Sequence, residues 1–162
     1  RVGGDTYSPK LVFVVVQKRN HCRIFSMQGN RVDNAQPGTV VDKEITTAAQ
    51  FDFYMCSHFG LKGTSRPTHY HVLCDDLTLR SDDLQRFTFD LCHLYARCTK
   101  IVSSPAPTYY AHLAAYHAHY YMSNFKDEDD NWETHSSISS SDSGGGHFNA
   151  VQRHLQDRLY FT

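Results

Sequence analysis

The chain has 162 residues, of which 40% are hydrophobic and 20% are charged, values that are ordinary for a soluble globular domain. Its longest apolar run, Leu11–Val16, is far shorter than the roughly 20 residues that a membrane-spanning helix needs. The five cysteines form no CxxC pair, which favours a reducing compartment over a disulfide framework. The composition therefore argues against a membrane span and against a scaffold held by disulfides.

The net charge of −1 hides an uneven distribution along the chain. Residues 1–125 carry 13 Lys and Arg against 10 Asp and Glu, which gives a net charge of +3. Residues 126–162 carry 3 against 7, which gives −4. The first part is mildly basic, so nucleic-acid binding depends on where its basic residues gather.

The start of the chain indicates a fragment of a longer domain. The chain opens on Arg1 rather than on methionine and has no signal-peptide pattern. The first predicted strand, Lys10–Gln17, is a continuous Val-rich run of the kind that is buried on both faces of a sheet. Because nothing before it supplies neighbouring layers, we expect that this chain does not fold without an upstream half.

Short strands and turns are predicted next. Pro37 and Gly38 interrupt the pattern, and Phe51–Ser57 alternates apolar and polar residues as a half-buried strand does. In chain order, the other expected elements are an extended segment at Arg23–Met27, a turn at Gln28–Asn30, a strand at Thr39–Val41, a loop at Gly60–Pro67 and a strand at Tyr70–Leu73.

Helices follow the strands. Ser81 is a predicted N-cap, with Asp82 and Asp83 placed to interact favourably with the dipole of the first turn. A second helix is predicted over Thr108–Met122, after two prolines. One face of the first helix comprises Leu84, Phe87, Thr88, Leu91 and Tyr95.

The end of the chain has a different composition. Residues 126–147 have no periodicity and predict a flexible acidic and serine-rich loop. A final helix is predicted from the spacing of Phe148, Val151, Leu155 and Leu159. Strands followed by helices predict a single α/β domain, with a sheet flanked by helices.

Basic residues gather in three groups, each at the exit of a predicted element. The groups are Lys18, Arg19, His21 and Arg23; Lys62 and Arg66 around Gly63, Thr64 and Ser65; and Tyr95, Arg97, Lys100, Ser103 and Ser104. Such groups are suited to follow a single-stranded nucleic-acid backbone, and the amides and hydroxyls of the second are suited to hold a phosphate. Ordinary surface charge at the ends of strands and helices is the alternative.

Two further sets of residues are candidate metal ligands. His69, His71 and Cys74 have an H-x-H-x-x-C spacing, but no second spaced pair completes the four ligands of structural zinc. Structural histidines are the alternative. Asp42 and the adjacent pair Asp75 and Asp76 end or follow strands, where two-metal nuclease ligands often lie. A turn-and-capping role is the alternative for the adjacent pair.

Several motifs carry a resemblance to a known family. They are QKRNHCR (Gln17–Arg23), GTVVD (Gly38–Asp42), FDFYMCSHFGLKGTSRPTHYHVLCDD (Phe51–Asp76), YARCT (Tyr95–Thr99), PAPTYYAHLAAY (Pro105–Tyr116) and a terminal YF. In this order they resemble the C-terminal part of the PIWI domain of eukaryotic Argonaute proteins. The resemblance implies an RNase H-like fold with a mixed sheet and flanking helices, incomplete without the upstream half.

The resemblance also implies small-RNA-guided gene silencing. Its expected partners are a small guide RNA, a target RNA, the rest of the Argonaute chain and proteins of the silencing complex, with no membrane. The family location is the cytoplasm, or the cytoplasm and the nucleus. The residues that match the family's guide-binding positions are Lys18, Arg19, His21, Arg23, His58, Arg66, Tyr95, Arg97, Ser103 and Tyr109.

Cleavage of the target is a separate question. Members of the family that cut RNA use an Asp-Glu-Asp-His set that binds two Mg²⁺ ions. His112, in YYAHL, matches the histidine, and the three acidic members are expected upstream of this sequence. Two interpretations stay open: a slicing enzyme, or a scaffold that binds guide RNA and recruits partners without cutting.

Some positions depart from the family pattern. After His112, where the family commonly has an arginine that reaches the guide 5′ phosphate, this chain has His117. Cys74 replaces the usual tryptophan of HVLWDD, and Asn20 stands where a histidine is common. The acidic loop resembles a variable family segment. We expect either phosphorylation of its serines, with repulsion of the target strand, or a solubilising role.

Overall fold

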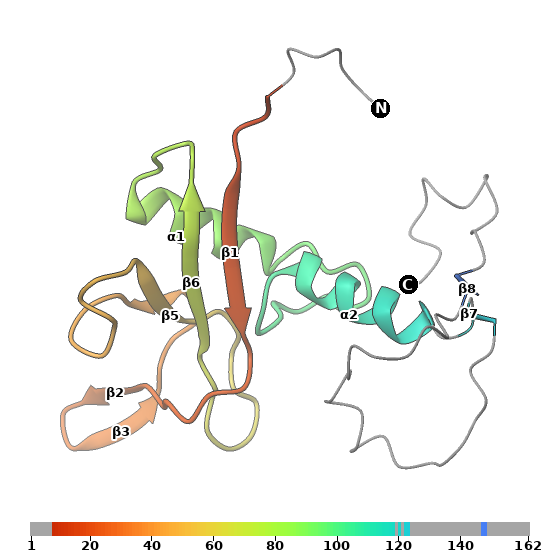
Figure 1. The fold of residues 1–162 in the computed structure, drawn as a ribbon. Coiled ribbons are helices and arrows are strands. Elements are labelled where there is room, and N and C mark those ends of the chain that lie inside the picture. The colour runs from red at the N-terminus through yellow and green to blue at the C-terminus, as the bar shows by residue number, and fades with distance from the viewer. Residues whose placement is uncertain (1–7, 119, 121, 124–146, 149–162) are drawn as a thin grey trace. The chain divides into compact units, whose positions relative to one another are not determined.

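The computed structural model describes residues 8–118, 120, 122–123 and 147–148 (Figure 1). The predicted acidic and serine-rich loop, apart from His147, lies outside these residues, as do Val151, Leu155 and Leu159 of the predicted final helix. The chain divides into two compact units, residues 1–109 and residues 110–162. Among the described helices, none is long and apolar enough to cross a membrane.

The first unit is built on a four-stranded sheet. Its strand order is β1 (Val12–Gln17), β6 (Thr68–Asp75), β5 (Asp52–Cys56) and β4 (Thr39–Val41), and each neighbouring pair is antiparallel (Figure 1). These four strands confirm the strands predicted from the sequence. The last of them in the chain, β6, extends beyond the predicted segment at both ends.

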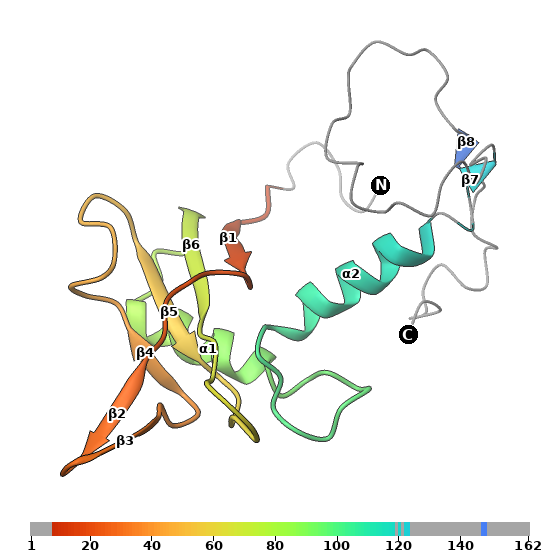
Figure 2. The ribbon, with the colours of Figure 1, turned by 90° about the horizontal axis from the view of Figure 1, so that it is seen from below.

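One face of the sheet packs against α1 (Ser81–Leu91), as Figure 2 shows from below. Phe53, Met55 and Tyr70 form the fully buried centre of this layer, and the ring of Phe89 from the helix packs against them. Alternation along the strands places these side chains on one face. The partly buried residues around the centre are Val14, Val16, Val40, Phe51 and Val72.

The prediction that the first strand is buried on both faces is wrong for the described residues. Burial alternates along β1, and the side chains of Phe13 and Val15 are 51% and 40% exposed. Among the described elements of this unit, a helix covers only the sheet face opposite these two side chains. The Val-rich run therefore forms a strand that is half-buried here.

The first helix begins one position earlier than the sequence predicts. Arg80 is the N-cap and makes no side-chain capping hydrogen bond, so Ser81 is the first helical residue. Asp82 and Asp83 lie in the first turn, as predicted. The apolar face is shifted, since Phe87 is exposed and the helix ends before Tyr95. The buried side of the helix comprises Leu84, Gln85 and Thr88.

A separate hairpin joins β1 to β4. It pairs β2 (Phe25–Gln28) with β3 (Arg31–Asn34) around a turn in which Gly29 has a φ of +61°, a conformation that glycine adopts without steric cost. The sequence predicted the first strand and the turn but not β3.

The second helix, α2 (Ala106–Ala118), ends before the predicted Met122. Met122 instead belongs to β7 (Met122–Ser123), which pairs with β8 (His147–Phe148). The prediction of helix at both Met122 and Phe148 is therefore wrong. Pro107 lies in the first turn of α2, where a residue without an N–H group is tolerated.

Candidate nucleic-acid interface

A polar pocket of about 290 Å³ opens in the first unit and is lined from three separated segments. Its lining residues are Lys18, His58, Thr64, Arg66, Thr68 and Ser103. Lys18 directly follows β1, Thr64 and Arg66 belong to the predicted loop, and Ser103 precedes α2. None of the lining residues is acidic, so the pocket favours an anion. Four of the predicted guide-binding residues thus meet at one pocket.

Of the other predicted residues, Tyr109 contacts the pocket lining and Tyr95 packs on Tyr109. The Nζ atom of Lys18 lies 4.1 Å from the ring centroid of Tyr109, in a cation–π arrangement. The Tyr109 hydroxyl and Ser103 Oγ share a hydrogen bond of 2.8 Å. The Tyr95 ring packs on Tyr109 with centroids 4.8 Å apart. The aromatic pair therefore holds the lysine and the serine in place.

His58 is a partly buried polar group of the lining. Its Nδ1 atom is buried and has no hydrogen-bond partner among the described residues. Burial lowers the pKa of His58 below its ordinary value, so the imidazole is neutral near pH 7. A neutral imidazole adds no third positive charge to the lining that contains Lys18 and Arg66. It can still donate one N–H group to an anion.

Thr68 was missed by the sequence reasoning. It is buried at the start of β6, and its Oγ1 donates a hydrogen bond of 2.5 Å to the Ser103 carbonyl. This contact joins the strand that follows the loop to the segment that precedes α2. The sequence signal that could have indicated Thr68 is its position directly after the loop residues Arg66 and Pro67.

The remaining predicted guide-binding residues of the first unit do not line the pocket. Arg19, His21 and Arg97 are exposed, and Lys62 is exposed on the loop. The guanidinium Nη1 of Arg23 donates to the carbonyls of Asn20 and Cys22, at 3.1 and 2.6 Å.

His112 and His117 both lie on α2, in the second unit. His112 is exposed. His117 lies in the last turn, and its ring centroid is 5.7 Å from that of Tyr116 and 6.0 Å from that of Tyr120. The helix supplies no Asp or Glu beside them.

The described residues hold one group with the composition of a metal site. The ligand atoms of Asp52, His69 and His71 lie within 4.8 Å of one another, on strands β5 and β6. Cys74 is not part of this group, and its Sγ lies 3.5 Å from Asp76 Oδ1. The predicted H-x-H-x-x-C set is therefore not brought together.

Internal contacts already satisfy the carboxylate of this group. His69 Nε2 lies 2.6 Å from Asp52 Oδ2, and the Thr47 N–H donates to Asp52 Oδ1 at 2.8 Å. Burial raises the pKa of Asp52, but these hydrogen bonds and the nearby His69 and His71 rings outweigh it, and the net pKa lies below its ordinary value. Tyr54 stacks on His69 with centroids 3.9 Å apart. These contacts support the structural role considered for the histidines.

The other candidate carboxylates also have structural partners. Asp75 accepts hydrogen bonds from the Leu77 and Leu79 N–H groups, at 3.0 and 2.7 Å, which confirms its predicted role in a turn. Asp76 Oδ2 accepts from the Leu11 N–H at 3.1 Å. Asp42 Oδ2 accepts from Gln85 Nε2 at 3.0 Å, which links the end of β4 to α1.

Comparison with known proteins places this fold. Residues 3–123 match the Piwi domain family. The chain is 53% identical over 116 residues to Protein argonaute 7 of Arabidopsis thaliana, and 54% identical over 122 residues to Protein argonaute 1C of Oryza sativa subsp. japonica. Each match covers 72% of this chain and 12% of the relative.

Solved structures give the same assignment. The C-terminal lobe of a budding yeast Argonaute matches with a TM-score of 0.65 and 39% identity, over 71% of this chain and 25% of that one. Kluyveromyces polysporus Argonaute with a guide RNA matches with the same TM-score and identity, over 71% of this chain and 15% of that one. Drosophila Piwi matches with a TM-score of 0.56 and 31% identity, over 66% of this chain and 14% of that one.

The fold therefore belongs to the RNase H-like class, and the prediction of that class is confirmed. The chain is a member of the Piwi domain family, as the C-terminal part of an Argonaute PIWI domain. It spans 12% of the length of the curated relatives that it matches.

Proposed function

We propose that this chain holds the backbone of a small guide RNA at its polar pocket, within an Argonaute that silences target RNA. Family membership supports small-RNA-guided silencing, and a neighbouring structure of the same fold contains a guide RNA. The rest of the Argonaute chain, the target RNA and proteins of the silencing complex are the further proposed partners. We propose the cytoplasm, or the cytoplasm and the nucleus, as the location.

One observation carries this proposal. Lys18, His58, Arg66 and Ser103 are far apart in the sequence and line one pocket that has no acidic group in its lining. Phosphate contacts from such groups fix the position of a nucleic-acid backbone without reading its sequence. Base pairing between guide and target then supplies the specificity.

The test measures guide affinity of the full-length protein against salt concentration. For a single strand, the slope of log K against log salt changes by about 0.7 for each phosphate contact. We expect Lys18→Ala and Arg66→Ala each to weaken binding and to reduce the slope by about that amount. Arg80→Ala is the matched control, since Arg80 is exposed, with its side chain 79% accessible, and does not line the pocket. Unchanged slopes for both pocket variants would refute the proposal.

We further propose that His112 contributes to cleavage of the target in the complete protein. Its exposure on α2 and its match to the family histidine support this role. The Piwi family is typically metal-dependent, but the described residues do not build a Mg²⁺ site: Mg²⁺ prefers oxygen ligands, and α2 supplies no carboxylate. The acidic ligands would come from the upstream part of the protein.

Cleavage assays separate an enzyme from a scaffold. For a slicing enzyme, His112→Ala abolishes cutting of a matched target by the full-length protein, and guide affinity stays unchanged. For the scaffold alternative, the wild-type protein loaded with guide does not cut, and silencing in cells is insensitive to His112→Ala.

A further inference from the structure

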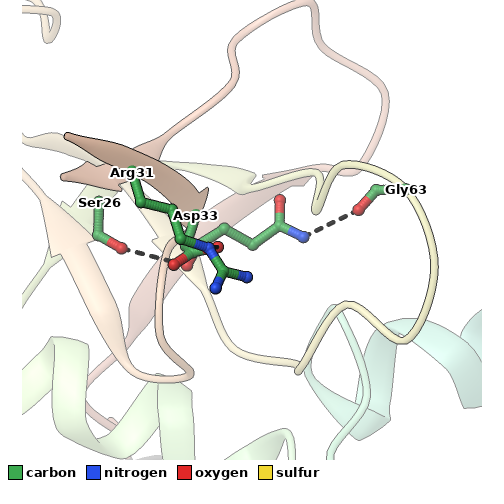
Figure 3. A network of polar contacts seen from close by, with 5 residues as sticks. Ser26, Arg31, Asp33 and Gly63 are labelled. Carbon is green, nitrogen blue, oxygen red and sulfur yellow. Dashed lines mark hydrogen bonds and ion pairs between the residues drawn. The ribbon is translucent and has the colours of Figure 1, made fainter. Parts of the chain in front are cut away.

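The loop that carries Thr64 and Arg66 is held by a side chain from the β2–β3 hairpin. At the end of β3, Asn34 Nδ2 donates to the Gly63 carbonyl at 2.8 Å, and Asn34 Oδ1 accepts from the Ser65 N–H at 3.0 Å. The side-chain amide of Asn34 thus binds the backbone groups of the two residues that flank Thr64. Figure 3 shows the Gly63 carbonyl at one end of this network and Ser26 at the other.

The network also fixes the end of the strand that supplies the amide. Ser26 Oγ, on β2, donates to the backbone carbonyl of Asn34 at 3.3 Å. On the same hairpin, Arg31 Nε lies 3.0 Å from Asp33 Oδ1. The backbone of Asn34 is therefore fixed by the neighbouring strand, while its side chain binds the loop.

The loop closes tightly around this amide. A Cβ atom added at Gly60 would lie 2.4 Å from Ser65 Oγ and 3.1 Å from Asn34 Nδ2. A larger residue at this position would force the Ser65 side chain to move. Ser65 is buried, and the next residue, Arg66, is exposed at the pocket. At the far end of the loop, Asn20 Nδ2 donates to the Pro67 carbonyl at 2.9 Å.

We propose that Asn34 is a positioning residue that fixes the loop so that Thr64 and Arg66 meet a guide phosphate. The inference rests on the proposed guide-binding function of the pocket. Asn34 does not line the pocket, so its effect on the guide passes through the loop. A loop that is already ordered loses less conformational entropy on binding than one that must be ordered by the RNA.

The test compares Asn34→Ala, Arg66→Ala and the double variant in the full-length protein. We expect Asn34→Ala to weaken guide binding and to reduce the salt slope, by at most the roughly 0.7 expected for one phosphate contact. In the Arg66→Ala background, most of the effect of Asn34→Ala is expected to disappear, because both act on the same contact. Asn30→Ala is the matched control, on the exposed turn of the same hairpin.

The outcomes separate the two proposals. If Arg66→Ala leaves affinity and slope unchanged, the guide-binding function of the pocket fails. If Arg66→Ala lowers both and Asn34→Ala changes neither, the positioning role of Asn34 fails while the pocket stands. If Asn34→Ala only reduces the fraction of active protein, measured by titration with guide at low salt, the residue is structural and the positioning role also fails. The salt slope does not depend on the active fraction.

Discussion

The buried contact between Asp52 and His69 makes a strong prediction about stability. Both side chains are largely buried, with 1% and 10% of their surfaces exposed. Asp52→Ala removes the partner of His69 and the acceptor of the Thr47 N–H. We expect a large loss of stability around β5 and β6.

The magnitude follows from the bonds that are lost. Hydrogen bonds to a charged group contribute about 1.5–3 kcal/mol each, so two of them account for about 3–6 kcal/mol. Breaking a buried pair by removing one partner costs about 3–5 kcal/mol, which agrees. Asp52→Asn keeps an acceptor for Thr47 and a polar group beside His69, so we expect about 1–2 kcal/mol for it.

The pH dependence has a definite sign. The folded-state pKa of Asp52 lies below its ordinary value, so its stabilising effect is present above that value and is lost as the pH falls through the folded pKa. Wild-type stability should therefore fall more steeply than that of Asp52→Asn below about pH 4.

The assay is amide hydrogen exchange in the full-length protein, with the opening free energy read from peptides that cover β5 and β6. Exposed Asp90 provides the matched control, and Asp90→Ala should change this free energy by less than about 0.5 kcal/mol. A loss of under about 1 kcal/mol for Asp52→Ala would show that the pair is not a stabilising element.

Three other substitutions give independent predictions. His117→Arg should tighten guide binding, because a guanidinium is permanently charged and offers a planar set of donors to a phosphate; an unchanged affinity would contradict this. Gly60→Ala should weaken guide binding, since its Cβ would lie 2.4 Å from Ser65 Oγ, and wild-type affinity would show that the loop can shift. Met55→Ala, at a 1% exposed core position, should lower the free energy of unfolding by about 2–5 kcal/mol in hydrogen exchange, and a change below about 1 kcal/mol would place Met55 outside the core.

The sequence predicts the main sheet well because its strands carry their own signals. The Val-rich run of β1 and the alternation around β5 predict extended segments correctly, but they do not predict which faces are buried. The strand β1 is half-buried, whereas β5, predicted to be half-buried, is buried at four of its five residues. The strand β3 has the sequence Arg-Val-Asp-Asn, which lacks that alternation. It forms because the turn at Gly29 brings it beside β2, and pairing rather than side-chain pattern decides it.

The contacts of the candidate site depend on register, which the sequence does not reveal. His69 and His71 were considered as candidate ligands together with Cys74, but the pairing of Asp52 with His71 across two strands determines that a carboxylate joins them instead. Cys74 was the nearer partner in sequence and lies elsewhere. Similarly, nothing local connects Asn34 with Gly63, which is 29 positions away. The periodicity of a sequence does not reveal a side chain that binds a loop far away along the chain.

The charge arrangement of the pocket supports a backbone phosphate rather than a base as its proposed ligand. The Tyr109 ring already contacts Lys18 and Tyr95. These contacts compete with the stacking of a base on the same ring. His58 is neutral in the free protein because burial lowers its pKa, and a phosphate placed beside it favours the protonated form. Binding would then take up a proton, so guide affinity attributable to His58 should increase as the pH falls. We therefore expect His58 to add a positive charge to the pocket only when an anion is bound.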